Sequence, residues 1–323
     1  MMRSRLFIFL LPFALTAWAQ TTRFSLEMTG AAATFLSPKT PSTPGTSETL
    51  RTSSPAFGGA GGLGVSYAYM WSSSPSNGWG ISLGLNVSFA SPGLSAAEQY
   101  RDSAMVPTQI WEGGDVPHDY GELQVDYDIR VNSARQYARQ LQLAVPVMLT
   151  GQTDVISWSA GARLLVPFGR GYRQVVDADI DARFPALGGY PVPNEYVTGR
   201  LPGTHYSGEM SLPYLSVQIG GKCSYRFVFD SSVAVYAPRR SVSFGVYAFC
   251  SVWSSSFRHG DAEHIVSVGT IEPPAPVYVK PVTDVLAVRM LLPLEVGLSV
   301  SYDVTTYRYN KRLHHPRHIV FRP

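Results

Sequence analysis

Residues 259–264 bring together two imidazoles and two carboxylates, the side chains that bind transition metals. His259 and His264 flank Asp261 and Glu263 within this short stretch. Zinc sites have a defined ligand spacing that this segment lacks, and a solvated loop has the same polar composition. We therefore expect no metal site and no cofactor here.

Calcium binding is the second chemistry that a spacing suggests. Asp177, Asp179 and Asp181 are spaced like the first ligands of an EF-hand loop. Ala182 stands where that loop needs its turn glycine, and Gly188 stands where it needs the bidentate acid. The segment therefore does not fit a calcium loop.

Hydrolysis is the third chemistry. Asp115, His118 and Asp119 could supply the base and acid of a catalytic triad at one rim of a folded sheet. No G-x-S-x-G sequence marks a nucleophile, and polar loop residues also lie close together by chance. We expect no catalytic residue and no enzyme.

Cys223 and Cys250 are the two cysteines of the chain. They lie in two consecutive predicted strands and would face each other if the turn between the strands were centred near Tyr236. An exported protein meets oxidising conditions, which permit a disulfide. Two separately packed thiols are the alternative, because a disulfide requires a narrow range of Cα separations.

The elements that position all these side chains are strands, and residues 59–89 show their pattern most clearly. Apolar residues occupy alternate positions on both sides of a short Ser- and Gly-rich turn, which is the period of a sheet that faces two different solvents. Tyr67, Tyr69, Trp71 and Trp79 crowd the turn end, as aromatic residues do at a membrane boundary. The segment predicts a transmembrane β-hairpin.

The same alternation recurs along the chain. It predicts strands at residues 22–35, 120–149, 156–168, 215–227, 242–253 and 286–302. Four long segments rich in Pro, Ser and Gly separate them and are predicted to be irregular, namely residues 37–59, 90–119, 169–209 and 254–283. Long and short connections therefore alternate, as in an outer-membrane barrel with long external loops and short periplasmic turns.

This topology predicts an all-β, transmembrane, antiparallel, up-and-down β-barrel of about eight strands. It requires residues 120–149 to form one strand whose first part projects beyond the bilayer. Residues 20–304 would form the barrel, and residues 305–323 a basic periplasmic tail. The alternative is a ten-stranded barrel that uses the tail as its last strand.

The inward faces of these strands carry charged residues of both signs. An eight-stranded barrel is only wide enough for side chains to fill it, so we expect the charges to neutralise one another and plug the lumen. Coordination of a solute is the alternative. The set is Glu27, Asp126, Asp128, Arg130, Arg163, Lys222, Arg226, Arg289 and Glu295.

Residues 1–19 predict an export signal. Arg3 and Arg5 precede an apolar run that is too short to span a membrane as a helix, and Ala17-Trp18-Ala19 fits a cleavage site. Removing Arg3 and Arg5 from the 26 basic residues leaves 24 against 23 acidic ones. This near balance gives no field for nucleic acid, and the expected location is the outer membrane.

One stretch resembles a known family. Residues 139–150 place a Pro-aliphatic run at the end of a strand, and a glycine-containing strand at residues 159–165 follows the turn. This arrangement resembles the Bacteroidetes-type (PorT-like) outer-membrane barrels, a porin-like family. The resemblance implies a barrel in the outer membrane and assigns no functional residue.

These patterns together predict an outer-membrane barrel with a structural or interaction role through its extracellular loops. The expected partners are outer-membrane lipid, the barrel-assembly machinery during insertion, and an extracellular ligand or protein at the loops, with no nucleic acid. A narrow pore for passive diffusion of small solutes is the alternative, and an enzyme at the outer membrane is the third hypothesis.

Overall fold

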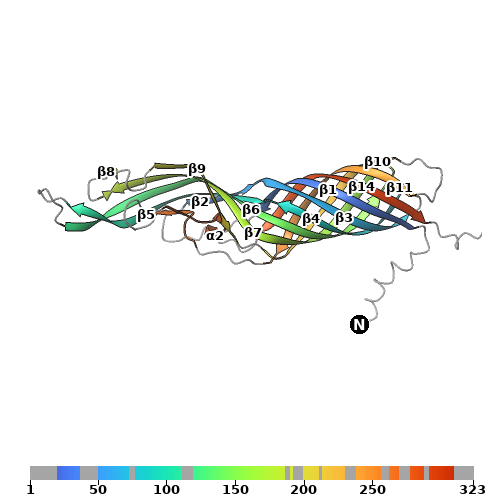
Figure 1. The fold of residues 1–323 in the computed structure, drawn as a ribbon, viewed down its shortest axis with the longest axis horizontal. Coiled ribbons are helices and arrows are strands. Elements are labelled where there is room, and N and C mark those ends of the chain that lie inside the picture. Colours follow the sequence, from blue (N-terminus) through green and yellow to red (C-terminus); the bar gives the residue numbers. More distant parts are fainter. Residues whose placement is uncertain are drawn as a thin grey trace, which may run out of the picture.

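The computed structural model shows an elongated molecule, with a closed barrel at one end and a long twisted sheet at the other (Figure 1). It describes residues 20–36, 50–72, 77–110, 119–185, 190–191, 199–210, 213–229, 238–255, 262–268, 277–286 and 291–308. The predicted export signal at residues 1–19 and residues 309–323 of the predicted tail lie outside the described residues.

Eight antiparallel strands close the barrel, which confirms the predicted fold class; the ten-stranded alternative is wrong. In order around the barrel they are β1 (Gln20–Leu36), β3 (Gly58–Ser72), β4 (Gly78–Ala90), β6 (Asp119–Gln152), β7 (Ile156–Phe184), β10 (Ser216–Val228), β11 (Arg239–Ser254) and β14 (Leu292–Arg308). The β14–β1 and β6–β7 pairings complete the ring, so the barrel has no open strand edge.

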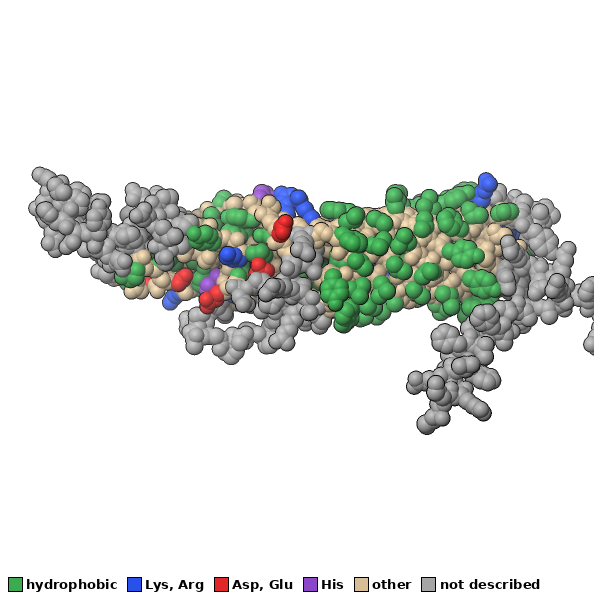
Figure 2. All heavy atoms as spheres, turned by 60° about the horizontal axis from the view of Figure 1, so that its bottom comes forward, with side chains coloured by type: hydrophobic (Ala, Val, Ile, Leu, Met, Phe, Trp, Pro, Cys, Tyr) green, Lys and Arg blue, Asp and Glu red, His purple; other side chains and the backbone are tan. Residues whose placement is uncertain are grey.

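The barrel wall follows the alternation of the sequence. On β1, Phe24, Leu26 and Met28 are half-exposed on the outside, whereas Arg23 and Ser25 are buried inside. The same outward apolar residues on the other strands form a band around the barrel (Figure 2). A closed barrel satisfies every backbone group within the ring, which is what a hydrocarbon environment requires.

Three short connections lie at one end of the barrel. β3 and β4 are joined by residues 73–77, β6 and β7 by residues 153–155, and β10 and β11 by residues 229–238. The connections at the other end are long. The predicted alternation of short and long connections is confirmed.

β6 is the longest strand, with 34 residues, and it continues far beyond the barrel, as predicted for residues 120–149. Together with β7 it carries a second sheet, which we call the extension. The extension consists of β2 (Leu50–Ala56), β5 (Gly93–Ile110), β8 (Tyr190–Pro191), β9 (Gly199–Glu209), residues 119–139 of β6 and residues 171–184 of β7. The prediction that residues 37–59, 90–119 and 169–209 are irregular was therefore wrong where these strands lie.

The inward and outward faces of β6 are exchanged at a β-bulge. Asn132 is an extra residue relative to both neighbouring strands, because the pairing shifts between Val131 and Ser133. Before the bulge the odd positions Tyr127 and Ile129 are buried, and after it the even positions are buried. β7 has a corresponding irregularity at Gly169, whose positive φ of 97° suits glycine.

Residues 262–268 and 277–286, which we call the covering segment, cover the inner face of the extension. They contain β12 (Val266–Val268), which pairs with β13 (Val277–Val279), and the single-turn helix α2 (Val282–Val285). Ile265, Val266, Val282 and Val285 pack into the largest apolar core of the described chain, against side chains of β5, β6 and β7. The extension therefore has a hydrophobic core of its own, outside the barrel.

Side chains of the extension cap the start of α2. The Gln174 side-chain carbonyl accepts the backbone N–H of Val282 at 3.2 Å, and that of Gln136 accepts the N–H of Thr283 at 2.9 Å. These bonds satisfy two N–H groups that a helix start leaves unpaired. Among the described residues no helix is long and apolar enough to cross a bilayer.

β14 differs from its predicted bounds at both ends. It begins at Leu292 rather than at residue 286, because Leu286 still belongs to the turn that ends α2. It runs to Arg308, paired with β1 up to the Gln20–Arg308 pair. Residues 305–308, assigned to the tail by the sequence, therefore belong to the last strand.

Candidate functional site

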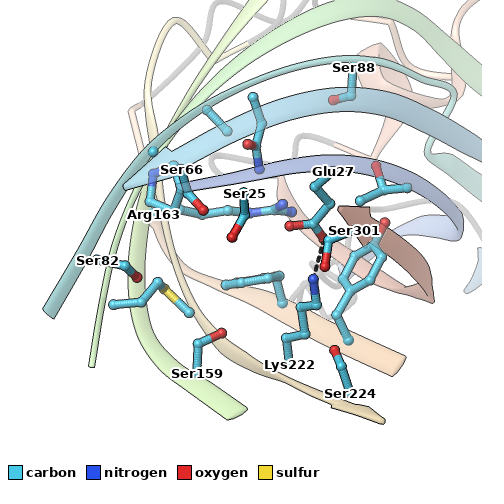
Figure 3. A pocket seen from close by; sticks show the side chains of 18 of the residues that line it. Ser25, Glu27, Ser66, Ser82, Ser88, Ser159, Arg163, Lys222, Ser224 and Ser301 are labelled. Atoms are coloured by element: carbon cyan, nitrogen blue, oxygen red, sulfur yellow. Dashed lines mark ion pairs between the residues drawn. The ribbon is translucent and has the colours of Figure 1, made fainter. Parts of the chain in front are cut away.

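The barrel encloses a polar cavity of about 100 Å³. Serine hydroxyls line much of its wall, with the ionised side chains of β1, β7, β10 and β14 between them (Figure 3). This volume has room for a few water molecules between the side chains of the lumen.

Arg163 and Glu295 form the more deeply buried ion pair of the lumen, with 8% and 5% of their side chains exposed. Arg163 also donates to the Gln218 side chain, and its guanidinium lies 4.1 Å from the ring centre of Phe249. β7, β10, β11 and β14 thus converge on one cation. The aromatic face adds a cation–π contact to the charge pair.

Lys222 and Glu27 form a second pair across the lumen, at 3.0 Å (Figure 3). Both side chains are more exposed to the cavity than the Arg163–Glu295 pair, at 17% and 19%. The two pairs bring together four of the nine residues that the sequence assigned to the lumen.

Towards the short turns, Arg226 donates to the backbone carbonyl of Thr153 at 2.9 Å. Arg23 donates to the Thr150 hydroxyl at 2.8 Å, and Asp303 accepts the Ser243 hydroxyl at 2.6 Å. Arg23 and Asp303 were missed by the sequence analysis. The sequence did indicate them, because Arg23 alternates in step with Glu27, and Asp303 with Glu295, on the inward side of the same strand.

Three of the predicted lumen residues lie elsewhere. Asp126, Asp128 and Arg130 are on the extension, where Asp126 and Arg130 are exposed and Asp128 is half-buried. They lie beyond the barrel, on the part of β6 that belongs to the extension, and the bulge at Asn132 turns the even positions before it towards the outer face there. Arg289 lies outside the described residues.

A buried carboxylate anchors residues 262–286 to the extension. The Glu98 side chain is fully buried and accepts hydrogen bonds from Arg51 at 2.6 Å and from His264 at 2.9 Å through Oε1. Its Oε2 accepts the Ile265 N–H at 2.9 Å. Arg51 also donates to the carbonyl of Val285 at 3.0 Å, so β2, β5 and the covering segment meet at one carboxylate.

The electrostatics of this anchor favour the ionised acid. Burial alone would raise the pKa of Glu98, but the hydrogen bonds from His264, Arg51 and the Ile265 amide outweigh it and lower that pKa. Tyr100 stacks on the His264 ring at 3.5 Å, and its hydroxyl donates to the Val266 carbonyl. Burial raises the pKa of Tyr100, which keeps this hydroxyl a donor.

The anchor was also missed by the sequence analysis. Arg51, Glu98 and His264 come from separate segments, so no spacing connects them. The available signal was the acid itself, because Glu98 shares its strand phase with Leu94, Ala96 and Tyr100. A carboxylate in an otherwise apolar phase indicates a buried partner.

Most of the other sequence candidates cannot be compared with the described fold. His259, Asp261, Asp115 and His118 lie outside the described residues, as does the Asp119 side chain. In the described part of the chain, no three His, Cys, Asp or Glu side chains gather in a way that could hold a metal ion.

The two cysteines do not face each other. Cys223 is the register partner of Val246, and Cys250 is the partner of Ile219. Cys223 therefore lies opposite a residue four positions before Cys250. A disulfide would need the centre of the β10–β11 hairpin to lie two residues later in the sequence. Both thiols are free.

No protein-family model and no curated protein matches this sequence. Among solved structures, the chain is similar to Ail, the attachment invasion locus protein of Yersinia pestis, in complex with the heparin analogue sucrose octasulfate. That match covers 88% of this chain and 99% of the other, at 8% identity and a TM-score of 0.20. The strand pairing and the apolar band show a closed, antiparallel, eight-stranded β-barrel with an apolar outer surface.

Proposed function

We propose that this protein is an outer-membrane anchor that presents the extension outside the cell as a contact surface for an extracellular ligand or protein. The observation that carries the proposal is the size and order of the extension. β6 and β7 continue beyond the apolar band, where β5 and β9 pair with them, and this second sheet has its own core and covering segment. A barrel that served only as a membrane plug would not need this second folded body.

The orientation follows from the connections. Outer-membrane barrels have short periplasmic turns and long external loops, so the end that carries the extension faces outward. Lipid of the outer membrane surrounds the apolar band, and the barrel-assembly machinery inserts it. The PorT-like resemblance of residues 139–165 agrees with this class of barrel and remains part of the proposal.

The lumen favours an anchor over a pore. Arg163, Glu295, Lys222 and Glu27 pair across it, and the remaining cavity is about 100 Å³. Paired charges in a narrow barrel fill the space that a solute would need. We therefore assign the interaction to the extension rather than to the lumen.

A barrel-only variant tests this assignment. Short turns replace residues 37–57, 91–139, 169–213 and 256–290, and the heat-dependent gel mobility of the outer-membrane fraction verifies folding and quantity. Cells that display either form are compared for adhesion to immobilised extracellular proteins and glycans and for aggregation with one another. We expect the full chain to adhere and the barrel-only variant to fail. Equal adhesion of both, or adhesion of neither, would contradict the proposal.

A further inference from the structure

The outer face of the extension carries a cluster of cationic side chains next to the barrel. Arg135 and Arg139 of β6, Arg173 of β7 and His205 of β9 are all exposed, and we call them the proximal basic face. They alternate with the buried residues that contact residues 262–286, so they point away from the covering segment. Figure 2 shows basic side chains and a histidine gathered where the apolar band ends.

The strand register places this face just above the membrane. Phe89, Leu141 and Phe168 are register partners on β4, β6 and β7, and their outward side chains mark the edge of the apolar band. Arg139 and Arg135 precede Leu141 on β6 by two and six residues, towards the extension. At ~3.3 Å per residue and a tilt of ~40°, their Cα atoms stand about 5 and 15 Å above Leu141.

This height corresponds to the headgroups of the outer leaflet. The polar region adds about 5–8 Å to each side of the hydrocarbon core, and large glycolipid headgroups reach higher. β6 and β7 are part of the barrel wall as well as of the extension, so their outer face is continuous with the lipid-facing surface. Headgroups beside the barrel therefore meet the proximal basic face directly.

The cationic side chains of this face outnumber its acids. Arg173 lies 3.2 Å from His205, and among the described side chains none of the three arginines has a carboxylate partner. Glu209 of β9 is the acid on the same face. The acids further out are already engaged, since Asp177 pairs with Arg200 at 3.1 Å and Asp179 accepts from Asn132 at 2.7 Å.

We propose that the proximal basic face binds the phosphate groups of phosphorylated glycolipid headgroups in the outer leaflet. Guanidinium groups donate two parallel hydrogen bonds to a phosphate, and they retain their charge at any physiological pH. This site holds the foot of the extension to the membrane surface. It is separate from any contact with an extracellular partner and does not depend on one.

The test titrates the full-length protein in a neutral detergent with bisphosphorylated lipid A, and native mass spectrometry counts the bound lipid. The variant R135Q/R139Q/R173Q removes the three arginines. The matched control R101Q/R130Q/R183Q removes three exposed arginines from the outer part of the extension, with the same change in net charge. Dephosphorylated lipid A and excess inorganic phosphate are the two further arms.

We expect the natural chain to bind bisphosphorylated lipid A roughly tenfold or more tightly than the dephosphorylated form. Each arginine near a membrane surface contributes roughly a fivefold change, so the proximal variant should lose about 100-fold, while the control changes by less than about threefold. High salt should weaken the binding, and inorganic phosphate should not displace the lipid.

Three outcomes would overturn the proposal. They are equal affinity for the two lipids, an unchanged affinity in the proximal variant, and an equal loss in the control, which would indicate only a general field. Displacement by inorganic phosphate would show a site for the free anion and would also overturn it. If the triple variant does not fold, R139Q against R101Q makes the same comparison, with an expected loss of roughly fivefold.

Discussion

Glu98 shows how a single buried acid holds two parts of this fold together. Its carboxylate accepts hydrogen bonds from β2, from His264 and from the backbone of Ile265, and water does not reach it. Hydrogen bonds to a charged group contribute about 1.5–3 kcal/mol each, more than those between neutral groups. The covering segment should therefore depend on this ionised side chain.

Replacing Glu98 by glutamine tests this dependence. The change keeps the shape but removes the charge, so we expect the attachment of residues 262–286 to weaken by on the order of 3 kcal/mol. Hydrogen exchange should accelerate at Ile265, Val266 and Val282, while the barrel strands exchange as before. Asp181→Asn, at an exposed side chain of β7 away from this site, is the control and should change nothing.

The same site predicts a dependence on pH. Because folding lowers the pKa of Glu98, its stabilisation is complete above the unfolded-state pKa of about 4.3 and is lost as pH falls through the lower folded value. The protection factors of residues 262–268, which are exchange rates corrected for the intrinsic rate at each pH, should therefore fall below about pH 4 in the natural chain and stay constant in the glutamine variant. Parallel pH profiles of both proteins would show that another group is responsible.

The lumen pairs give a second residue-level prediction. Arg163→Ala leaves Glu295 buried and unpaired, which should cost about 3–5 kcal/mol of unfolding free energy. Lys222→Ala should cost less, because water screens the more exposed pair with Glu27. Urea titrations of both variants in lipid vesicles, followed by tryptophan fluorescence, measure the difference. An equal and small effect would mean that the Arg163 pair contributes nothing to the fold.

For single residues, the sequence predicted which alternate positions of each strand are charged. It did not always predict whether those positions face the barrel interior. Glu27, Arg163 and Lys222 line the barrel cavity, because their strands keep one phase throughout the barrel. Asp126 and Asp128 do not, because they lie on the extension, where one inserted residue also exchanges the two faces of β6. Nothing in the local alternation of residues 123–130 reveals which side is the interior.

Among the elements, β6 and its bulge determine how the barrel and the extension are joined. Asn132 lets Tyr127 and Ile129 join the core of the extension, while Gln142 and Ala144 line the barrel. In a strand without the bulge, the same alternate positions would be buried in the extension and in the barrel. Bulges are used in this way to redirect side chains at barrel rims.

Deleting Asn132 should unfold the extension and spare the barrel. The deletion moves Tyr127 and Ile129 to the outer face, so the extension core loses residues that are almost fully buried. Limited proteolysis should then cut residues 93–139, while the gel mobility of the folded barrel persists. Asn132→Ser keeps the bulge and loses only the bond to Asp179, so it should remain resistant. A resistant deletion variant would show that the register adapts.

The strands of the barrel were predictable and those of the extension were less so. Barrel strands carry large apolar residues at every second position. In β7 beyond Gly171, the buried positions are Tyr172, Gln174, Val176, Ala178, Ile180 and Ala182, which include a glutamine and two small residues. The apolar side chains are smaller than in the barrel because the covering segment, not lipid, contacts this face. Residues 176–184 nevertheless alternate apolar and charged residues, and the sequence analysis considered their aspartates only as calcium ligands.

For the whole molecule, the orientation in the membrane is directly testable. After Cys223 and Cys250 are replaced by serine, single cysteines are introduced at Arg101 and Ser207 of the extension and at Asp154 of a short turn, all of which are exposed. A membrane-impermeant thiol reagent applied to intact cells should label the first two positions and not the third. Labelling of Asp154 alone would reverse the assigned orientation.

The central claim is that the barrel is a closed anchor and that contacts are made by the extension. Two ion pairs cross the lumen, Arg163–Glu295 and Lys222–Glu27. The purified full-length protein should therefore show no stable ion conductance in planar bilayers. Single-channel recording is the most direct measurement of this claim. A reproducible open conductance, with an ion selectivity that changes in the Arg163→Ala variant, would contradict it and identify the protein as a narrow pore.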